Sequence, residues 1–274
     1  MTYDNLIELI RKRQSYLCIG LDTDVDKLPL HFEKSMASVI EFNKKIIDAT
    51  RAYCVAYKPN TAFYERYGAA GWQALTETIA YIGDTHFIIA DAKRGDIGNT
   101  ATQYAKAFFE TLRCDAITVA PYMGHDSIAP FVGHPDKWAI MLALTSNSGA
   151  NDYQLTVNEH NQPLYEQVIV NTQTYSGPHN MMYVVGASKT QYLERVRELA
   201  PTHFLLIPGV GAQGGSLEEV SRLGLTPDAL LLVNNTREIL YASDAADYAE
   251  AAATKASTIQ REMQLYLSLY SFKK

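Results

Sequence analysis

The chain has 274 residues, 47% of them hydrophobic, which is enough to bury a sizeable core. Its formal net charge of -6 argues against a broad nucleic-acid-binding surface, because such surfaces are usually basic, but it allows a small pocket for one phosphate. Residues 1–14 form an amphipathic, charged pattern and not a signal peptide, and no apolar run could cross a bilayer. We therefore expect a cytoplasmic protein that binds neither membranes nor nucleic acid, with its three cysteines buried and reduced.

Short apolar, β-branched runs alternate with longer helical patterns along the chain. Several runs are apolar on both faces, as the strands of a parallel sheet covered on both sides must be. We predict strands at residues 16–21, 55–58, 87–90, 116–119, 139–144, 182–185, 204–207 and 229–233. Helices are predicted at residues 35–50, 71–81, 100–112, 192–199 and 217–223.

Eight strands with intervening helices favour an α/β fold, namely a single (β/α)8 TIM barrel over residues 1–274 with an N-terminal helix. A doubly wound open sheet is the alternative. The polar segment 147–179 follows the fifth strand and contains one helical pattern, PLYEQVIV. A long excursion at this position is usually an active-site loop or an interface, so we expect an active-site loop there. The alternative is a surface insertion without function.

Polar residues recur at one place in the repeated units. Asp22, Lys58, Asp91, Ser146 and Gly209 each lie just after an apolar run, at the C-terminal end of a predicted strand. Barrel active sites are assembled at this face from several different strands. The regular placement is the first indication of an active site.

The densest group of charged residues follows the apolar run HFIIA. It reads Asp91-Ala-Lys93-Arg-Gly-Asp96-Ile97-Gly-Asn-Thr100. Asp91 and Lys93 alternate along a strand end and should share a face, and Asp96 and Thr100 would share a helix face. Burying these charges is costly unless they pair, so a purely structural ion-pair network is the alternative to a catalytic group.

The DxKxxDI pattern of Asp91, Lys93, Asp96 and Ile97 is similar to the signature of the orotidine 5'-phosphate decarboxylases. The surrounding ADAKRGDIGNTATQYAKAFF resembles the longer bacterial branch of that family. Further segments resemble the family in the same order along the chain: CIGLDTDVDKLP, VAYKPNTAFYE, LTSNSGA, IPGVGAQGG and VNNTREIL. Each string alone is weakly specific, but their order along nearly the whole chain is highly specific.

The resemblance implies a carboxy-lyase that converts orotidine 5'-phosphate to UMP and CO2 in pyrimidine biosynthesis, without a metal or an organic cofactor. Loss of CO2 leaves a carbanion at C6 that the ring delocalises poorly, so the enzyme must supply electrostatic stabilisation and a proton. Lys93 suits both tasks. A charge pair at ~4 Å is worth roughly 4 kcal/mol at an effective dielectric of about 20, so substrate binding must contribute the remainder.

The resemblance also implies roles for the neighbouring charges. Asp91 would lie near the substrate carboxylate, and Asp91 and Asp96 would hold Lys58 and Lys93 in place and charged. Asp22 and Lys58 would hydrogen-bond the ribose hydroxyls.

Three residues would act between subunits. By resemblance, Asp96, Ile97 and Thr100 reach into the neighbouring subunit's site, so a homodimer would be required for activity.

Ser146, in LTSNSGA, would bind the amide edge of the pyrimidine, although Ser and Asn also favour a plain turn there.

The phosphate site is expected in two parts. Glycines in PGVGAQGG let backbone amides face a phosphate, and Gln213 is the family's side-chain contact there. Arg237 offers a bidentate guanidinium. Many relatives have Gly directly before this Arg, whereas this chain has Thr236, which could donate its hydroxyl or its amide.

His125 is expected to be structural, because the reaction needs no general base.

Three other functions remain open at this stage. The 3-keto-L-gulonate 6-phosphate decarboxylases resemble the chain at the Asp-x-Lys-x-x-Asp motif, but they use a divalent metal and an acidic second-strand ligand where this chain has Lys58. A Schiff-base aldolase would need a neutral lysine, which nearby carboxylates disfavour. A nucleotide-binding barrel without activity would be expected to lack Lys93 or its acidic partners, and both are present.

Overall fold

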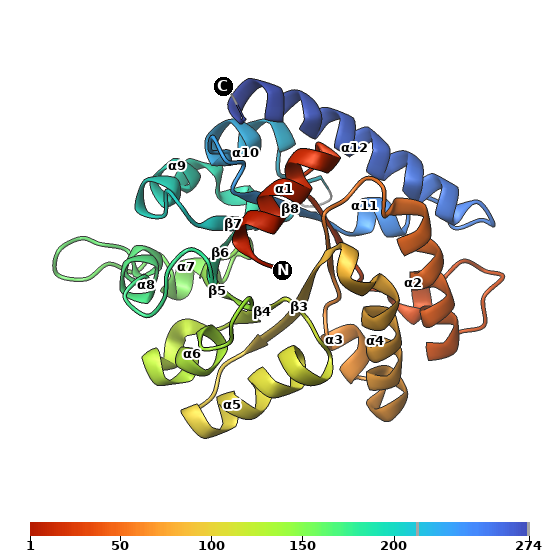
Figure 1. The fold of residues 1–274 in the computed structure, drawn as a ribbon, viewed down its shortest axis with the longest axis horizontal. Coiled ribbons are helices and arrows are strands. Elements are labelled where there is room, and N and C mark those ends of the chain that lie inside the picture. Colours follow the sequence, from red (N-terminus) through yellow and green to blue (C-terminus); the bar gives the residue numbers. More distant parts are fainter. Residues whose placement is uncertain (212–213, 273–274) are drawn as a thin grey trace.

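The computed structural model describes residues 1–211 and 214–272 of the chain. Its eight strands form a closed barrel in which each strand pairs in parallel with the next and β8 pairs with β1 (Figure 1). This confirms the TIM barrel and excludes the open sheet. The strands are Leu17–Gly20 (β1), Ala56–Lys58 (β2), Phe87–Arg94 (β3), Ala116–Val119 (β4), Trp138–Leu144 (β5), Met181–Val185 (β6), Phe204–Pro208 (β7) and Leu231–Asn235 (β8).

Helices surround the barrel and alternate with the strands (Figure 1). The longer helices are Tyr3–Arg13 (α1), Met36–Thr50 (α2), Gly68–Ile82 (α4), Gly98–Lys106 (α5), His125–Val132 (α6), Leu164–Thr172 (α8), Thr190–Leu199 (α9), Leu217–Gly224 (α10) and Tyr248–Tyr270 (α12). Single turns occur at Ala62–Glu65 (α3), Ala150–Tyr153 (α7) and Arg237–Leu240 (α11). Short 3-10 turns are Val25–Lys27 (η1), Gly83–Thr85 (η2), Pro121–Met123 (η4) and Ala187–Lys189 (η5), and a π turn, Ala107–Thr111 (η3), extends α5.

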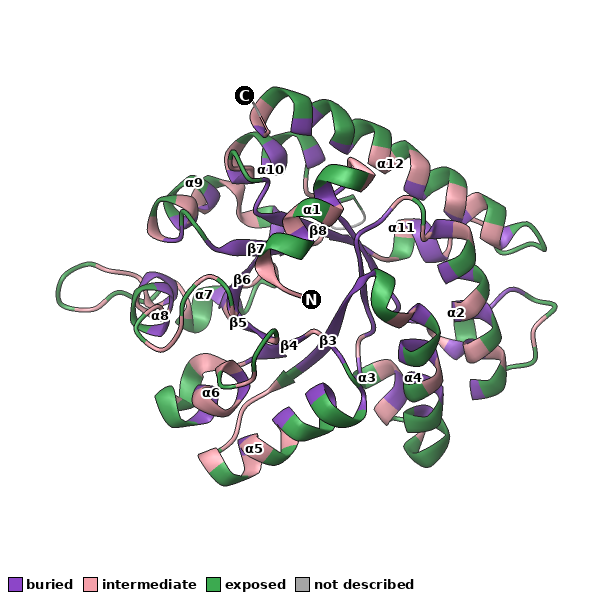
Figure 2. Ribbon diagram, in the orientation of Figure 1, coloured by how far each residue is buried: buried purple, intermediate pink, exposed green. Residues whose placement is uncertain are grey.

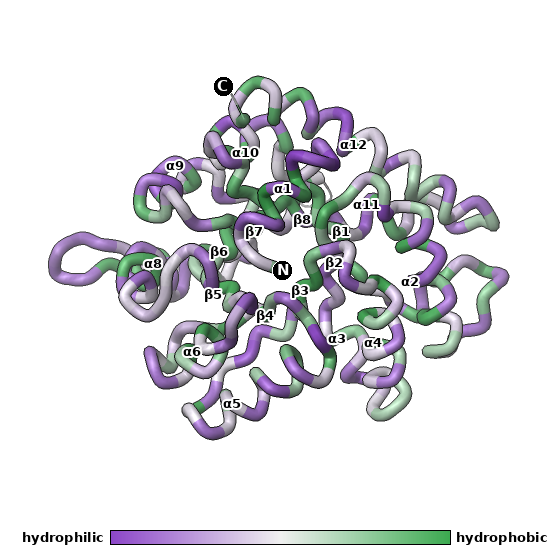
Figure 3. The backbone as a smooth tube through the Cα atoms, in the orientation of Figure 1, coloured by the Kyte–Doolittle hydropathy of each residue, from purple (hydrophilic) through white to green (hydrophobic). Residues whose placement is uncertain are grey.

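The core lies in and around the barrel wall. Every residue of β1, β2, β4, β6 and β8 is buried, while the helices expose their outer faces (Figure 2). The barrel strands carry the most hydrophobic stretches (Figure 3), although β2, β3 and β8 end in polar residues. This burial on both faces is why the strands could be predicted as continuous apolar runs.

Helix α1 lies across the N-terminal end of the barrel (Figure 1). The ring of Tyr3 packs 6.0 Å from Trp138 and 5.5 Å from Phe204, which are the first residues of β5 and β7. Trp138 also donates its Nε1–H to the carbonyl of Met1 at 2.9 Å. This end is therefore covered, and access to the interior is left to the opposite face.

Two strands differ from their predicted bounds by more than one residue at an end. β8 runs from Leu231 to Asn235 and not over 229–233, because Ala229 has a left-handed backbone (φ 56°) and cannot start a strand. Asn234 therefore belongs to the barrel wall. β3 continues beyond residue 90 to Arg94, but its register against β4 shifts after Ala90.

The segment after β5 is long, as predicted, and carries structure of its own. The PLYEQVIV pattern forms α8, and a short bridge pairs Val157 with Pro163. Helix α12 was not among the helices predicted above. No helix in the described part of the chain is long and apolar enough to span a membrane.

Candidate active site

Two adjoining cavities open at the C-terminal end of the barrel. The larger, about 450 Å³, extends from Lys58 and Asp91 towards Ser146 at the end of β5. The smaller, about 200 Å³, extends from the same two residues towards Gly209 and Arg237, after β7 and β8. A ligand could therefore lie across the barrel mouth with the charged pair beneath its middle.

Two lysines bind one carboxylate at the centre of the site. Lys58 Nζ lies 2.7 Å from Asp91 Oδ2, and Lys93 Nζ lies 2.5 Å from Asp91 Oδ1. The Lys58 side chain is 5% exposed, whereas that of Lys93 is 51% exposed and lines the larger cavity. Lys58 is thus a buried cation, and Lys93 is the ammonium that a ligand can reach.

The backbone of β3 brings Lys93 to this position. Lys93 has a left-handed backbone (φ 47°) at the register shift of β3, a conformation that costs a non-glycine residue of order 1 kcal/mol. Its amide donates to Thr118 Oγ1 of β4 at 2.9 Å, and this hydroxyl donates to Asp91 Oδ1 at 3.1 Å. Thr118 was not predicted as a site residue.

The electrostatics of the array follow from burial and pairing. Burial alone would raise the pKa of Asp91, but the ammonium groups of Lys58 and Lys93 outweigh it and hold that pKa well below its usual range. Burial opposes the charged form of Lys58, but Asp91 and Asp22 outweigh this effect and raise its pKa. Asp91 and Lys58 therefore remain an ion pair at neutral pH.

Asp22 is placed beside this array with one oxygen unsatisfied. Its Oδ1 is buried and has no hydrogen-bond partner among the described residues. Burial, the largest effect, raises the pKa of Asp22 against the attraction of Lys58. Because Asp22 lines the smaller cavity, its carboxylate is placed to accept a hydrogen bond from a hydroxyl-bearing ligand there.

The far end of the larger cavity is built from the segment after β5. Ser146 and Gln154 both line it. The Gln154 side-chain amide forms two hydrogen bonds with Thr145. Its Oε1 accepts from the Thr145 backbone N–H at 2.8 Å, and its Nε2 donates to Thr145 Oγ1 at 2.9 Å. A Cβ on Gly186 would lie 2.6 Å from the Cα of Ser146, so only glycine allows β6 to approach this turn. Like Thr118, Gln154 was not predicted as a site residue.

The smaller cavity ends at a glycine-rich turn and an arginine. Gly209, Gly211 and Gly214 have positive φ angles of 96°, 78° and 84°, which only glycine adopts readily. Thr236 and Arg237 line the cavity opposite this turn. Gln213 lies outside the described residues.

Three predicted site residues are not brought to this chain's own cavities. Asp96 accepts the amide of Ile97 at 2.8 Å, Ile97 is 58% exposed, and neither these two nor Thr100 is among the residues that line the two cavities. The ring of His125 packs 4.6 Å from Tyr175, consistent with a structural role.

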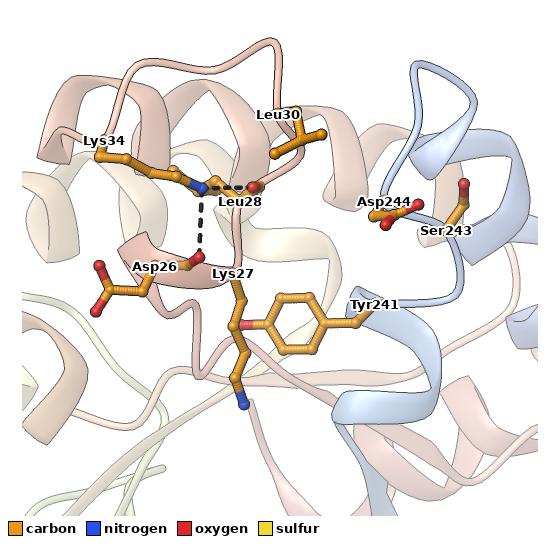
Figure 4. A pocket seen from close by; sticks show the side chains of 8 residues that line it. All are labelled: Asp26, Lys27, Leu28, Leu30, Lys34, Tyr241, Ser243 and Asp244. Carbon is orange, nitrogen blue, oxygen red and sulfur yellow. Dashed lines mark hydrogen bonds between the residues drawn. The ribbon is translucent and has the colours of Figure 1, made fainter.

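A separate groove lies beside the site, between the loop after β1 and the turn after α11 (Figure 4). Lys34 spans its rim by donating to the carbonyls of Asp26 and Leu28. Tyr241 lines the groove, and its hydroxyl accepts the amide of Asp24 at 2.9 Å. The groove thus belongs to the support of the loop that carries Asp22.

Fold and site together define a (β/α)8-barrel enzyme with a lysine–carboxylate–lysine array beside a glycine-rich turn. The chain belongs to the orotidine 5'-phosphate decarboxylase / HUMPS family, whose model matches residues 15–252. It is 54% identical over 266 residues to the orotidine 5'-phosphate decarboxylase of Christiangramia forsetii, covering 96% of this chain and 97% of that protein. The family inferred from sequence is confirmed.

Solved structures agree with this assignment. The Leishmania donovani OMP decarboxylase matches with a TM-score of 0.82 and 38% identity, over 97% of this chain and 99% of that one. The UMP synthase of the same organism matches with a TM-score of 0.81 and 40% identity over 95% of this chain, which spans only 57% of that longer protein.

Proposed function

We propose that this protein decarboxylates orotidine 5'-phosphate to UMP and CO2, with Lys93 stabilising and protonating C6. The C6–carboxylate bond breaks with its electron pair left on C6, CO2 departs, and the Lys93 ammonium transfers one proton to that pair. The observation that carries the proposal is the Lys93 ammonium, held 2.5 Å from Asp91 and open to the larger cavity. A preorganised cation at the developing negative charge lowers the barrier because it need not reorient during the reaction.

The two cavities match the parts of this substrate. The pyrimidine would occupy the larger cavity against Ser146, and the phosphate would occupy the smaller one between the glycine-rich turn and Arg237. The ribose would then lie over Asp22 and Lys58, both of which line the smaller cavity, and the Asp22 carboxylate would accept a hydroxyl hydrogen. Asp91 would face the substrate carboxylate, and their repulsion is relieved as CO2 leaves.

A homodimer is the second part of this proposal, and it concerns the three residues left outside the cavities. We propose that Asp96, Ile97 and Thr100 complete the site of the partner subunit. Ile97 is 58% exposed and two further large apolar residues are exposed after β4, Tyr122 at 93% and Met123 at 48%. Exposed apolar side chains of this kind are typical of surfaces that pack against another chain.

The site disfavours the two other lysine-dependent functions. A sugar-phosphate decarboxylase with a divalent metal would need an acidic ligand at the end of β2, where Lys58 is instead buried and paired with Asp91 at 2.7 Å. A Schiff-base enzyme would need an unprotonated amine, whereas Asp91 and Asp22 raise the pKa of Lys58.

The decisive experiment measures turnover by the absorbance change of orotidine 5'-phosphate in buffer containing EDTA. We expect turnover by the wild type, none by Lys93→Ala, and wild-type rates for Lys12→Ala, which removes an exposed lysine on α1 at the other end of the barrel. Absence of turnover in the wild type, or metal-dependent decarboxylation of a keto-sugar phosphate, would overturn the proposal.

A further inference from the structure

Behind Thr236, buried side chains of two neighbouring strands form a row of hydrogen bonds. Cys18 of β1 and Asn234 of β8 are register partners, and the Cys18 thiol donates to Asn234 Oδ1 at 3.6 Å. Asn234 Nδ2 in turn donates to Thr236 Oγ1 at 3.2 Å. Cys18 is 0% exposed and Asn234 is 6% exposed, so the bond between them is buried, while the bond from Asn234 to Thr236 lies at the wall of the smaller cavity.

The row has a fixed direction. Burial raises the pKa of the Cys18 thiol, so this group keeps its hydrogen and remains a donor. Asn234 must then present its oxygen to Cys18 and its NH2 group to Thr236. Because Thr236 Oγ1 accepts from Asn234, its own hydrogen must point elsewhere. Among the residues that the structure describes, no acceptor receives it, and Thr236 lines the smaller cavity.

The barrel wall makes room for this arrangement at Gly20. A Cβ atom on Gly20 would lie 1.9 Å from Thr236 Oγ1, a distance that no pair of nonbonded atoms tolerates. Gly20 is the last residue of β1, next to the strand that carries Asn234. The threonine hydroxyl therefore occupies a space that exists only because the adjoining strand ends in glycine.

We infer that Asn234 is a positioning residue that turns the Thr236 hydroxyl into a donor aimed at the substrate phosphate. The inference rests on the proposed function for its ligand, a nucleoside 5'-monophosphate. A phosphate dianion offers only acceptors, so a hydroxyl whose hydrogen faces it can donate a hydrogen bond to it. A hydroxyl that donates back to the protein cannot. Together with Arg237, Thr236 would select the phosphate over a neutral group.

The test uses Asn234→Asp, a variant of the same shape, to reverse the hydrogen bond between residue 234 and Thr236. In Asn234→Asp both side-chain oxygens accept, so the Thr236 hydroxyl turns away from the ligand. Dissociation constants for UMP and uridine are measured by calorimetry. We expect Asn234→Asp and Thr236→Val each to weaken UMP about tenfold, or about 1.4 kcal/mol, with under twofold change for uridine. Thr236→Ser, which keeps the hydroxyl, should stay within about twofold of the wild type for both ligands.

A double variant separates orientation from charge. If Asn234 acts through Thr236, Asn234→Asp should cost under about twofold in UMP affinity once residue 236 is Val. An equal loss in both backgrounds would mean simple repulsion by the new carboxylate, and would overturn the inference. So would a Thr236→Val protein that binds UMP as the wild type does. Thermal unfolding of each variant shows that it is folded. Failure of the wild type to prefer UMP over uridine would instead count against the proposed function.

Discussion

Thr118 donates its hydroxyl hydrogen to Oδ1 of Asp91 across 3.1 Å, from the strand next to the one that carries Asp91. The same hydroxyl oxygen accepts the amide of Lys93 at 2.9 Å. One buried side chain on β4 thus fixes both the Asp91 carboxylate and the backbone of Lys93. Position 118 therefore controls the geometry of the array without being charged itself.

Replacing Thr118 by Val keeps the shape but removes both bonds. We expect kcat to fall about tenfold with little change in KM, because a misplaced ammonium mainly affects the transition state. Thr118→Ser keeps the hydroxyl and should stay within about threefold of the wild type. An unchanged kcat in Thr118→Val would show that the array orients itself. Steady-state kinetics with orotidine 5'-phosphate measures both parameters.

Asp91→Asn should destabilise the fold as well as abolish turnover. It leaves the Lys58 ammonium buried without its 2.7 Å partner, and breaking a buried pair typically costs about 3–5 kcal/mol. Adding Lys58→Met removes the unpaired buried ammonium and should recover a large part of the lost free energy of unfolding. Urea unfolding of the single and double variants measures it. Equal stability of the wild type and Asp91→Asn would contradict a structural role for the pair.

Mixing two inactive variants tests the shared site. Asp96→Ala and Lys93→Ala should each be inactive, but subunit exchange should restore partial activity. In a mixed dimer, one site receives an intact Lys93 from one chain and an intact Asp96 from the other. Mixing Lys93→Ala with Asp91→Ala is the control and should restore nothing, since both residues lie in the same array. No recovery after verified exchange would place Asp96 outside the partner's site.

Arg237→Ala should weaken phosphate-bearing ligands selectively. A charge-assisted bond to phosphate is worth about 1.5–3 kcal/mol, so UMP affinity should fall at least tenfold while uridine affinity stays nearly constant. The matched control is Arg222→Ala, which removes an exposed arginine from α10. Equal losses for UMP and uridine would remove Arg237 from the phosphate site.

Stability should fall as the pH drops from about 6.5 to about 4, because burial lowers the pKa of both His86 and His203 to about 4. Between these pH values the two histidines bind protons in the unfolded chain but remain neutral in the folded chain. Acidification therefore lowers the free energy of unfolding, by roughly 2–3 kcal/mol for each histidine. Neither ring nitrogen of His203 has a partner among the described residues, so His203→Phe should flatten the pH dependence. His160→Gln, at a side chain 79% exposed, should leave it unchanged. Urea unfolding at pH 4.5 and 7 distinguishes the two.

The fold was predictable because parallel strands covered on both sides leave continuous apolar runs, as at β5 and β7. The end of β8 was misplaced for the converse reason. Asn234 and Asn235 are polar yet buried, and polarity alone placed them outside the strand. The left-handed backbone of Ala229, two residues before the strand begins, leaves no mark in the hydrophobic pattern.

The charged centre of the site was predictable and its neutral supports were not. Lys58, Asp91 and Lys93 stand out because charged residues directly after apolar strand runs are seldom buried unless they pair. Thr118, in the run AITV, has the β-branched shape expected of any strand residue. Asn234 accepts its hydrogen bond from the thiol of Cys18, 216 positions away in the chain, and such a contact exists only once the barrel has closed.

The left-handed backbone of Lys93 has a consequence for protein design. Transplanting Asp-x-Lys onto the end of another barrel strand would copy the residue types but not the register shift between Ala90 and Arg94. On a regular strand, the amine would project along a different vector and miss its carboxylate. A functional design would need to transfer the irregular end of β3 together with the neighbouring Thr118 hydroxyl.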